Sequence, residues 1–475
     1  MSGTFVVGET KIRPGVYTRR ENAGGVEIAG AVNGIGAAVI RANWGPLNKI
    51  VWIESPVDAA AAFGLPGTGH TVNIIDEMLT GGASKVAAVR AGSGGTAATI
   101  TLKDTTGSPI SVVTLTANFV GSRALSATIK DNLADNTKRD CIIYAGTMEF
   151  EKVTFAKGST GDGEPAALVA AFANSKNFTA AKLADGNKIM ATVSSAAFTP
   201  GTDPQTTSTE YSAALNVLES AVWNVLIVDT NDTTIHQLVA AFIDRVYEAG
   251  SNSIAVVAEP KSVAIGTRMA NAAAFNDEKI IYPLNGAYDA GGTLYDGYLL
   301  AARIGGMVAA IPSNQSLTHE VVRGMVSQAE PLTNTEIETA LQSGCLVLST
   351  NTSGQIWIEQ GINTLITPSG NQDAGWKKIR RVKTRFELID RISDTTAPLI
   401  GKVNNDSDGR AAIIAGANGV IKRMIGEKKL LDGTCIEDTS NPAVGDSAWF
   451  IIAVDDIDSI ERVYLTFRFR FSAEA

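Results

Sequence analysis

The chain has 475 residues, of which 45% are hydrophobic and 19% charged, and it carries a formal net charge of −9. This length predicts about three domains, and the composition is that of a globular protein rather than a disordered chain. The acidic balance excludes a general binder of nucleic acids or other polyanions, because binding phosphates requires a basic field.

The first 29 residues contain few core-forming side chains and predict an extended N-terminal arm rather than a domain. A short strand is expected over residues 4–7, Pro14-Gly15 marks a turn, and an extended segment restarts after it. We expect neither a signal peptide nor membrane anchoring. The N-terminus lacks a basic and apolar leader pattern, and no apolar run is long enough to span a bilayer.

Residues 30–92 predict the first part of an α/β domain. Ser55, Pro56 and Gly64 bracket a short helix, because Ser caps helix N-termini, Pro suits the first helical position and Gly commonly follows the last. The expected elements are a strand, this helix, a second helix and a further strand, over residues 36–41, 56–63, 71–79 and 85–90. The Gly-rich residues 91–96 predict a linker.

Residues 93–205 predict an outer domain inserted into the α/β domain. Its strands are short and are separated by turns that contain Gly, Asn or Asp, a pattern typical of a small β-sandwich. The expected strands cover residues 99–103, 111–117, 141–144 and 152–155, and a helix is expected over residues 164–174.

Residues 206–330 predict the second part of the α/β domain. Strands and helices alternate here, which indicates a parallel sheet covered on both faces. The expected strands cover residues 225–228, 253–258 and 279–282, and the expected helices cover residues 211–220, 234–249 and 296–310.

Residues 331–460 predict a C-terminal domain of mixed helix and strand. The expected elements are a helix, a hairpin, a long helix and a strand, over residues 335–342, 345–359, 408–430 and 447–453. The basic run at residues 377–385 is either a solvated face or a contact for an acidic protein surface. Nucleic acid is a weaker alternative, because the run lacks interleaved aromatic residues for base stacking.

Residues 461–475 contain a stretch that alternates strictly between apolar and polar side chains. Five apolar residues share one face of this stretch: Val463, Leu465, Phe467, Phe469 and Phe471. A period of two predicts a β-strand with one buried face. Such a strand must pair with a sheet, which belongs either to this chain or to a neighbouring subunit.

The sequence predicts no catalytic residue, cofactor site or metal site. A Ser-His-Asp triad needs an imidazole base; the chain has only His70, His236 and His319, and no Gly-x-Ser-x-Gly motif. It also lacks a Walker loop and a complete dinucleotide fingerprint. The oxygen-rich stretch Asn404–Gly409 lacks the spaced Glu of a calcium loop, and we expect it to be the turn that caps the long helix. Three widely separated Cys residues predict neither a disulfide framework nor a zinc site.

Several short stretches occur in order along most of the chain. They are Pro14-Gly-Val-Tyr17, Trp44-Gly-Pro46, residues 115–123, residues 301–309 followed by Ser316-Leu-Thr-His319, Gly361-Ile-Asn-Thr-Leu365 and residues 400–406. Together they resemble the tail sheath proteins of contractile bacteriophage tails and of the related R-type bacteriocins. The resemblance implies a subtilisin-like α/β core domain with an inserted β-sandwich. It also implies a C-terminal α+β domain that faces a tube and has exchanged terminal strands.

The resemblance further implies a structural protein without enzymatic activity. Its subunits would form stacked hexameric rings around an inner tail tube, with baseplate and tail terminator proteins as further partners, and contract to drive the tube through a cell envelope. The expected location is a phage virion or a bacteriocin particle assembled in the host cytoplasm. A static tube or shell protein is the alternative, and a hydrolase on an α/β scaffold is disfavoured by the missing triad.

Two sets of residues are assigned to contacts on this basis. The residues expected to exchange between subunits are Phe5, Val6, Val7, Val16, Tyr17, Val463, Leu465, Phe467, Phe469 and Phe471. The residues expected to face the tube are Lys422, Arg423, Lys428 and Lys429.

Overall fold

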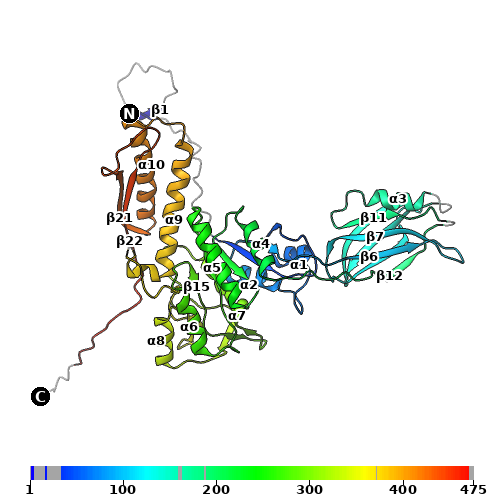
Figure 1. Ribbon diagram of the computed structural model, residues 1–475, viewed down its shortest axis with the longest axis horizontal. Coiled ribbons are helices and arrows are strands. Elements are labelled where there is room, and N and C mark those ends of the chain that lie inside the picture. The colour runs from blue at the N-terminus through cyan, green and yellow to red at the C-terminus, as the bar shows by residue number, and fades with distance from the viewer. Residues whose placement is uncertain are drawn as a thin grey trace. The chain divides into compact units, whose positions relative to one another are not determined.

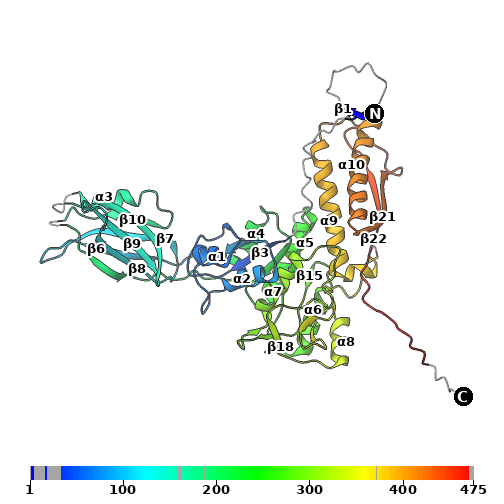
Figure 2. The same cartoon turned by 180° about the vertical axis from the view of Figure 1, so that it is seen from behind.

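The computed structural model describes residues 2–4, 16–18, 34–158, 163–186, 189–370 and 372–469, and Figures 1 and 2 show it from opposite sides. It divides into two compact units. One unit comprises Met1–Val32 and Glu387–Asp456, and the other comprises Asn33–Phe386 and Ile457–Ala475. Several separate sheets and a mixture of helices and strands confirm the predicted α/β and α+β multidomain class.

The larger unit is built around a six-stranded sheet with the strand order β15-β14-β13-β3-β5-β4. Five of its strands are parallel, as the alternation of strands and helices predicted, and β4 is an antiparallel edge strand. The strands are β3 (Ile35–Ile40), β4 (Ile50–Ile53), β5 (Lys85–Arg90), β13 (Val225–Val228), β14 (Ile254–Val256) and β15 (Ile280–Ile281).

Helices cover both faces of this sheet, because successive residues of β3 contribute to two different cores. Ala38 and Ile40 pack with α1, α2 and α7, whereas Ala37 and Val39 pack with α4, α5 and α6. The bounds are α1 (Pro56–Phe63), α2 (Asn73–Gly81), α4 (Ser208–Leu218), α5 (Thr233–Glu248), α6 (Ile265–Phe275) and α7 (Gly297–Ala310). As predicted, Ser55 caps α1 and accepts a hydrogen bond from the amide of Asp58.

The predicted boundary at residue 331 differs from the structure, because residues 331–386 belong to the larger unit. Leu346 and Leu348 are buried on one side of the sheet, and Cys345 and Val347 on the other. The amide of Leu346 donates to the carbonyl of Tyr282, so this segment continues the sheet beyond β15. The further elements here are α8 (Asn334–Gln342), β16 (Ala287–Asp289), β17 (Leu294–Tyr295), β18 (Met325–Gln328), β19 (Leu348–Thr350), β20 (Ile356–Ile358) and η1 (Ala374–Lys377).

Two sheets lie between β5 and α4 in the chain, with the strand orders β10-β9-β8-β12 and β11-β7-β6. They share one buried core, to which Ile129 and Cys141 contribute from one sheet and Leu115 and Phe178 from the other. The elements are β6 (Ala97–Lys103), β7 (Ser111–Val120), β8 (Leu125–Asp131), β9 (Lys138–Ala145), β10 (Met148–Ala156), α3 (Glu164–Ala171), β11 (Phe178–Lys182) and β12 (Val193–Ala197).

The predicted linker at residues 91–96 joins β5 to β6 of the sandwich, and its backbone is paired. Ser93 and Thr96 form backbone bridges with Gln205 and Thr202, so the outgoing and returning segments pair with each other. Trp44, from the loop after β3, also enters the sandwich core, with its ring centroid 5.2 Å from that of Phe119 and 5.4 Å from that of Phe150. Paired backbone and an inserted indole ring therefore attach the sandwich to the rest of the larger unit.

The smaller unit contains a two-stranded hairpin packed on helices (Figure 1). Its elements are the part of α9 (Ile379–Thr396) from residue 387 onward, η2 (Ala397–Leu399), α10 (Ser407–Gly426), β21 (Leu430–Glu437) and β22 (Phe450–Asp456). As predicted, the turn before α10 caps the helix: Asp406 accepts from the amide of Gly409 at 2.9 Å. The helix ends at Gly426 rather than at residue 430, because Lys428 has φ +59° and Leu430 begins β21. At the N-terminus, β1 (Ser2–Thr4) and β2 (Val16–Thr18) form a parallel pair.

Candidate assembly interface

The hairpin of β21 and β22 carries apolar side chains that the described part of the chain leaves exposed. Leu431, Ile436 and Ile451 are 69%, 51% and 45% exposed. Ile452 lies opposite Cys435 in the ladder, yet Cys435 is buried whereas Ile452 is 41% exposed. The inner face of the hairpin is therefore covered less at Ile452 of β22 than at Cys435 of β21.

The two edges of the hairpin differ in how their main-chain groups are used. On β21, the side chain of Asn418 accepts from the amide of Cys435 at 2.8 Å and its amide group lies 3.4 Å from the carbonyl of the same residue. Asn418 therefore occupies part of the β21 edge. In the described residues, β22 pairs only with β21, so its outer edge faces away from the ladder. An edge of this kind is a template for pairing with another strand.

The alternating C-terminal segment is paired with no strand of the chain's described part. Val463, Leu465, Phe467 and Phe469 are 69% to 88% exposed, although the alternation predicted one buried face. The rings of Phe467 and Phe469 stack with centroids 6.4 Å apart, as two side chains on one face of an extended chain do. Figure 1 shows residues 461–469 as an extended trace.

The other residues expected to exchange lie either in β2 or outside the described residues. Val16 and Tyr17 lie in β2, where they pair with Ser2 and Gly3 of β1. The remaining four lie outside the described residues: Phe5, Val6, Val7 and Phe471.

The basic run at residues 377–385 is bound within its own unit, so both the solvated face and the contact for an acidic partner are wrong. Lys378 pairs with Asp458 at 2.7 Å. Lys383 is buried and donates to the carbonyls of Val308 and Ile311. The physical reason is that the run lies at the start of α9, whose apolar residues Ile379, Val382 and Phe386 are buried. The basic residues between them therefore also lie against the larger unit rather than in solvent.

One of the four residues expected to face a tube instead forms buried ion pairs within the chain. Lys429 is only 7% exposed, and its ammonium group lies 2.7 Å from carboxylate oxygens of both Glu387 and Glu427. Its assignment to a tube contact is therefore corrected. The side chains of Lys422, Arg423 and Lys428 are exposed. Sequence reasoning missed the difference, because Glu387 lies on another helix, far away in the chain.

A Ser, a His and an Asp do meet, but not in catalytic order. Ser122 Oγ and His70 Nε2 both hydrogen-bond to the same oxygen of Asp203, at 2.7 and 2.9 Å. A triad requires the imidazole to lie between the hydroxyl and the carboxylate, whereas here the carboxylate lies between the other two. This arrangement provides no base for the serine. It links the loop after α1 to two loops of the inserted sandwich, at Ser122 and Asp203.

The other two histidines are likewise engaged in structural contacts. His236 is buried, its Nε2 lies 2.9 Å from the carbonyl of Thr230, and burial lowers its pKa. The ring of His319 stacks on that of Trp357, with centroids 3.8 Å apart. Within the described ranges, no three His, Cys, Asp or Glu side chains come together as metal ligands.

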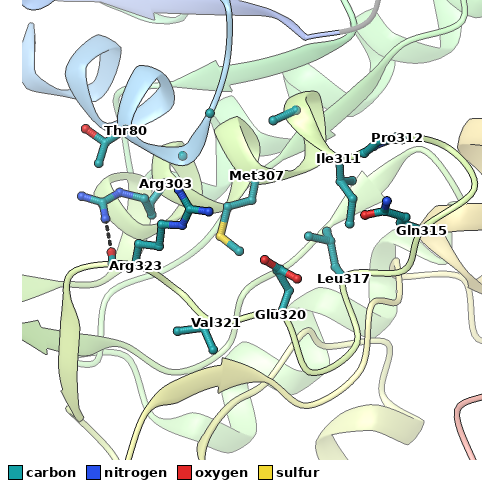
Figure 3. A pocket seen from close by; sticks show the side chains of 13 residues that line it. Thr80, Arg303, Met307, Ile311, Pro312, Gln315, Leu317, Glu320, Val321 and Arg323 are labelled. Atoms are coloured by element: carbon teal, nitrogen blue, oxygen red, sulfur yellow. Dashed lines mark hydrogen bonds between the residues drawn. The ribbon is translucent and has the colours of Figure 1, made fainter.

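A cavity of about 290 Å³ lies beside the C-terminal ends of α2 and α7 (Figure 3). Met307 and Leu317 give it apolar walls. Arg303 forms an ion pair with Glu77 and donates to the carbonyl of Arg323. The lining contains no His, Cys or Ser.

Among the helices of the described residues, none is both long and apolar enough to cross a membrane.

Comparisons with known proteins point to one family. Residues 205–364 match the model of the phage tail sheath protein central domain, and residues 371–470 match that of the phage tail sheath C-terminal domain. The chain is also 22% identical over 488 residues to a protein of Bacillus subtilis (strain 168) named uncharacterized protein YqbK, covering 97% of this chain and 98% of that protein.

Solved structures of sheath proteins share the fold. A sheath tail protein from Desulfitobacterium hafniense superposes with a TM-score of 0.68 at 20% identity, covering 93% of this chain and all of the other. One from Listeria innocua gives a TM-score of 0.68 at 19% identity, covering 89% and 95%. The helical sheath of the anti-feeding prophage, in its contracted state, gives 0.56 at 9% identity, covering 97% and 99%.

Proposed function

Because the chain belongs to the phage tail sheath protein family, we propose that it polymerises around an inner tube and contracts to drive that tube through a target envelope. This family consists of structural sheath proteins and is not known as a family of enzymes. The observation that carries the proposal is that one chain contains two parts that each lack a partner. One is an apolar segment without a sheet, and the other is a two-stranded sheet with exposed apolar residues.

The C-terminal segment of one subunit would add to the hairpin of another. In this arrangement, β22 is the better acceptor edge, because Asn418 occupies part of the edge of β21. The segment's apolar face would then cover Ile452 and the exposed inner side of the hairpin. Strand addition of this kind combines main-chain hydrogen bonds with alternate side-chain pockets.

The expected stabilisation is large enough to hold subunits together. Each main-chain hydrogen bond contributes about 0.5–1.5 kcal/mol net. Full burial of each of Phe467 and Phe469 contributes about 1.5–3 kcal/mol, since both are exposed in the single chain. A tether of this strength would survive while the larger units slide past one another during contraction.

Deletion of residues 463–475 tests the assembly step. We expect the shortened protein to stay folded by circular dichroism and to remain monomeric in sedimentation, while the full chain forms tubes visible by electron microscopy. Tubes of normal yield from the shortened chain would reject strand exchange as the assembly device.

Contraction separates this proposal from its alternative, a static tube or shell. A contractile sheath has two helical states, so electron microscopy of assembled particles should show two subunit spacings, before and after exposure to a destabilising agent. A single lattice under all conditions would favour the static alternative. The wider setting that we propose is a phage or bacteriocin particle assembled in the host cytoplasm, with inner tube, baseplate and tail terminator proteins as partners.

The exposed cations Lys422, Arg423 and Lys428 are the remaining candidates for contact with the tube. Reversing all three to Glu should weaken copolymerisation with tube protein more than self-assembly, because complementary charge mainly steers and orients partners. The matched control is Lys402→Glu, at another exposed lysine of the same unit. Equal loss of both kinds of assembly would reject a tube-facing role.

A further inference from the structure

The exposed C-terminal segment begins immediately after a fully engaged carboxylate. Glu461 has a side chain that is 6% exposed, whereas residues 462–469 are all exposed. One of its oxygens accepts from Ser316 Oγ at 3.2 Å and Thr318 Oγ1 at 3.0 Å. The other accepts from Gln360 Nε2 at 3.1 Å and pairs with the ammonium group of Lys378 at 3.1 Å. The residues on both sides of Glu461 are exposed, so this side chain is what holds this point of the chain.

Two further contacts hold the residues just before Glu461. Asp458 pairs with Lys378 at 2.7 Å, and Arg380 donates to the carbonyl of Ile457. The segment is thus attached at three points within residues 457–461, which we call the root. All of these contacts lie inside the larger unit.

The groups that bind Glu461 come from three separate parts of the unit and are themselves held. Ser316 and Thr318 lie in the loop after α7, Gln360 follows β20, and Lys378 precedes α9. The amide of Gly361 donates to Thr318 Oγ1 at 3.0 Å, which leaves the hydroxyl hydrogen of Thr318 directed at Glu461. These contacts form a preorganised socket rather than a chance surface ion pair.

The socket holds Glu461 as an anion. Burial alone would raise the pKa of this carboxyl group, but the hydrogen bonds from Gln360 and Lys378 and the charge of Lys378 outweigh it, and the pKa is lowered. Burying a carboxylate is costly unless it is paired and hydrogen-bonded, and this one is both. A fixed anchor next to an exposed segment would set the direction in which that segment leaves the subunit.

We propose that Glu461 is a positioning residue: its socket fixes the point and direction from which residues 462–469 leave the subunit, so that the strand reaches its neighbour in one register. The proposal rests on the strand exchange proposed above and specifies how it is controlled. It also assigns a role to part of the basic run at residues 377–385, which binds the acidic root of its own chain.

A fixed root would preserve the register in which the C-terminal segment pairs with its acceptor strand. Slipping a strand by one residue moves its whole apolar set to the opposite face. Eight extended residues reach roughly 26 Å, at about 3.3 Å each. Releasing residues 457–461 would add five residues of slack, lower the effective concentration of the strand at its acceptor and permit other registers.

Spin labels on the full-length monomer test the geometry directly. Labels at Thr335→Cys, on α8, and Thr466→Cys, on the polar face of the segment, are both at exposed sites of the larger unit. The three native cysteines are buried, so the introduced thiols react first. At a concentration below polymerisation, Glu461→Ala should broaden the distance distribution, whereas the control Glu338→Ala, at an exposed glutamate of α8, should not. Equal widths in all three proteins would overturn the proposal.

Polymerisation gives a second readout. Glu461→Ala should raise the protein concentration needed for half-maximal tube formation by about tenfold, the factor that corresponds to about 1.4 kcal/mol, and Glu461→Gln should raise it by less. If deletion of residues 463–475 abolishes tubes while Glu461→Ala assembles like the wild type, positioning by Glu461 is wrong and strand exchange stands. If the deleted chain still forms tubes, strand exchange itself is wrong.

Discussion

The ammonium group of Lys429 lies 2.7 Å from a carboxylate oxygen of Glu387, and both side chains are buried. This pair joins the end of α10 to α9 within the smaller unit. Arg391 and Glu427 complete the cluster, since Arg391 binds both carboxylates. From the sequence, Lys429 looks like part of an exposed basic patch. In the structure it is a buried residue that stabilises the smaller unit.

Replacing Lys429 should destabilise this unit. Removing one partner of a buried ion pair costs about 3–5 kcal/mol when the other charge is left unpaired. We expect Lys429→Met to cost less than that, because Arg391 still neutralises Glu387. Hydrogen exchange of α10 amides would report the loss. The matched control is the exposed Lys422→Met, which should leave α10 protected; equal effects of both changes would contradict the assignment.

The two faces of the C-terminal segment should differ in their effect on assembly. Phe467 and Tyr464 are 73% and 89% exposed, so replacing either with Ser should leave the thermal stability of the monomer unchanged. Phe467→Ser should strongly reduce tube formation, because its ring lies on the apolar face, whereas Tyr464→Ser should reduce it little. Pelleting assays over a concentration series would measure both, and equal losses would contradict a single buried face.

Trp44 should be required for the stability of the inserted sandwich. It is 2% exposed and packs against Phe119 and Phe150 in the sandwich core, although it follows β3 in the sequence. Trp44→Ala should therefore cost about 3–5 kcal/mol through the cavity that it leaves. Local hydrogen exchange in β7 and β10 would measure this. Trp52→Ala, at a 43% exposed indole, is the control and should cost far less.

The acid sensitivity of the smaller unit should depend on Glu427. Burial alone would raise its pKa, but the hydrogen bonds from Arg391 and Lys429 lower it to about 2 from an ordinary value of 4.5. Because the pKa is lower in the folded state, Glu427 contributes stability above its ordinary pKa and loses it as the pH falls from about 4.5 to about 2.

Thermal unfolding from about pH 6 to about pH 2 would show this dependence. Glu427→Gln should be less stable than the wild type above pH 4.5 and should have a flatter profile below it. Parallel profiles for the two proteins would show that Glu427 does not contribute to the acid sensitivity.

Much of the fold was predictable from local signals. Ser55 and Gly64 marked the ends of α1, because a capping hydroxyl and a flexible glycine act within a few residues of the helix. The run of apolar strands and helices predicted the parallel sheet, since a strand buried on both faces must be apolar throughout. The alternation of residues 463–469 predicted an apolar face and the need for a partner strand, and the structure leaves that face exposed.

Other features depended on contacts between residues far apart in the chain. The sequence left residues 377–385 as a solvated face or a contact for an acidic surface, and the family resemblance placed Lys429 toward a tube. The structure instead pairs Lys378 with Asp458 and Lys429 with Glu387, and it pairs the linker residue Ser93 with Gln205. The sequence by itself determined which segments are helical, extended or apolar, because those properties arise from neighbouring residues. Only the tertiary structure decided which charges are buried and which apolar face is left open, because burial depends on partners that local sequence does not identify.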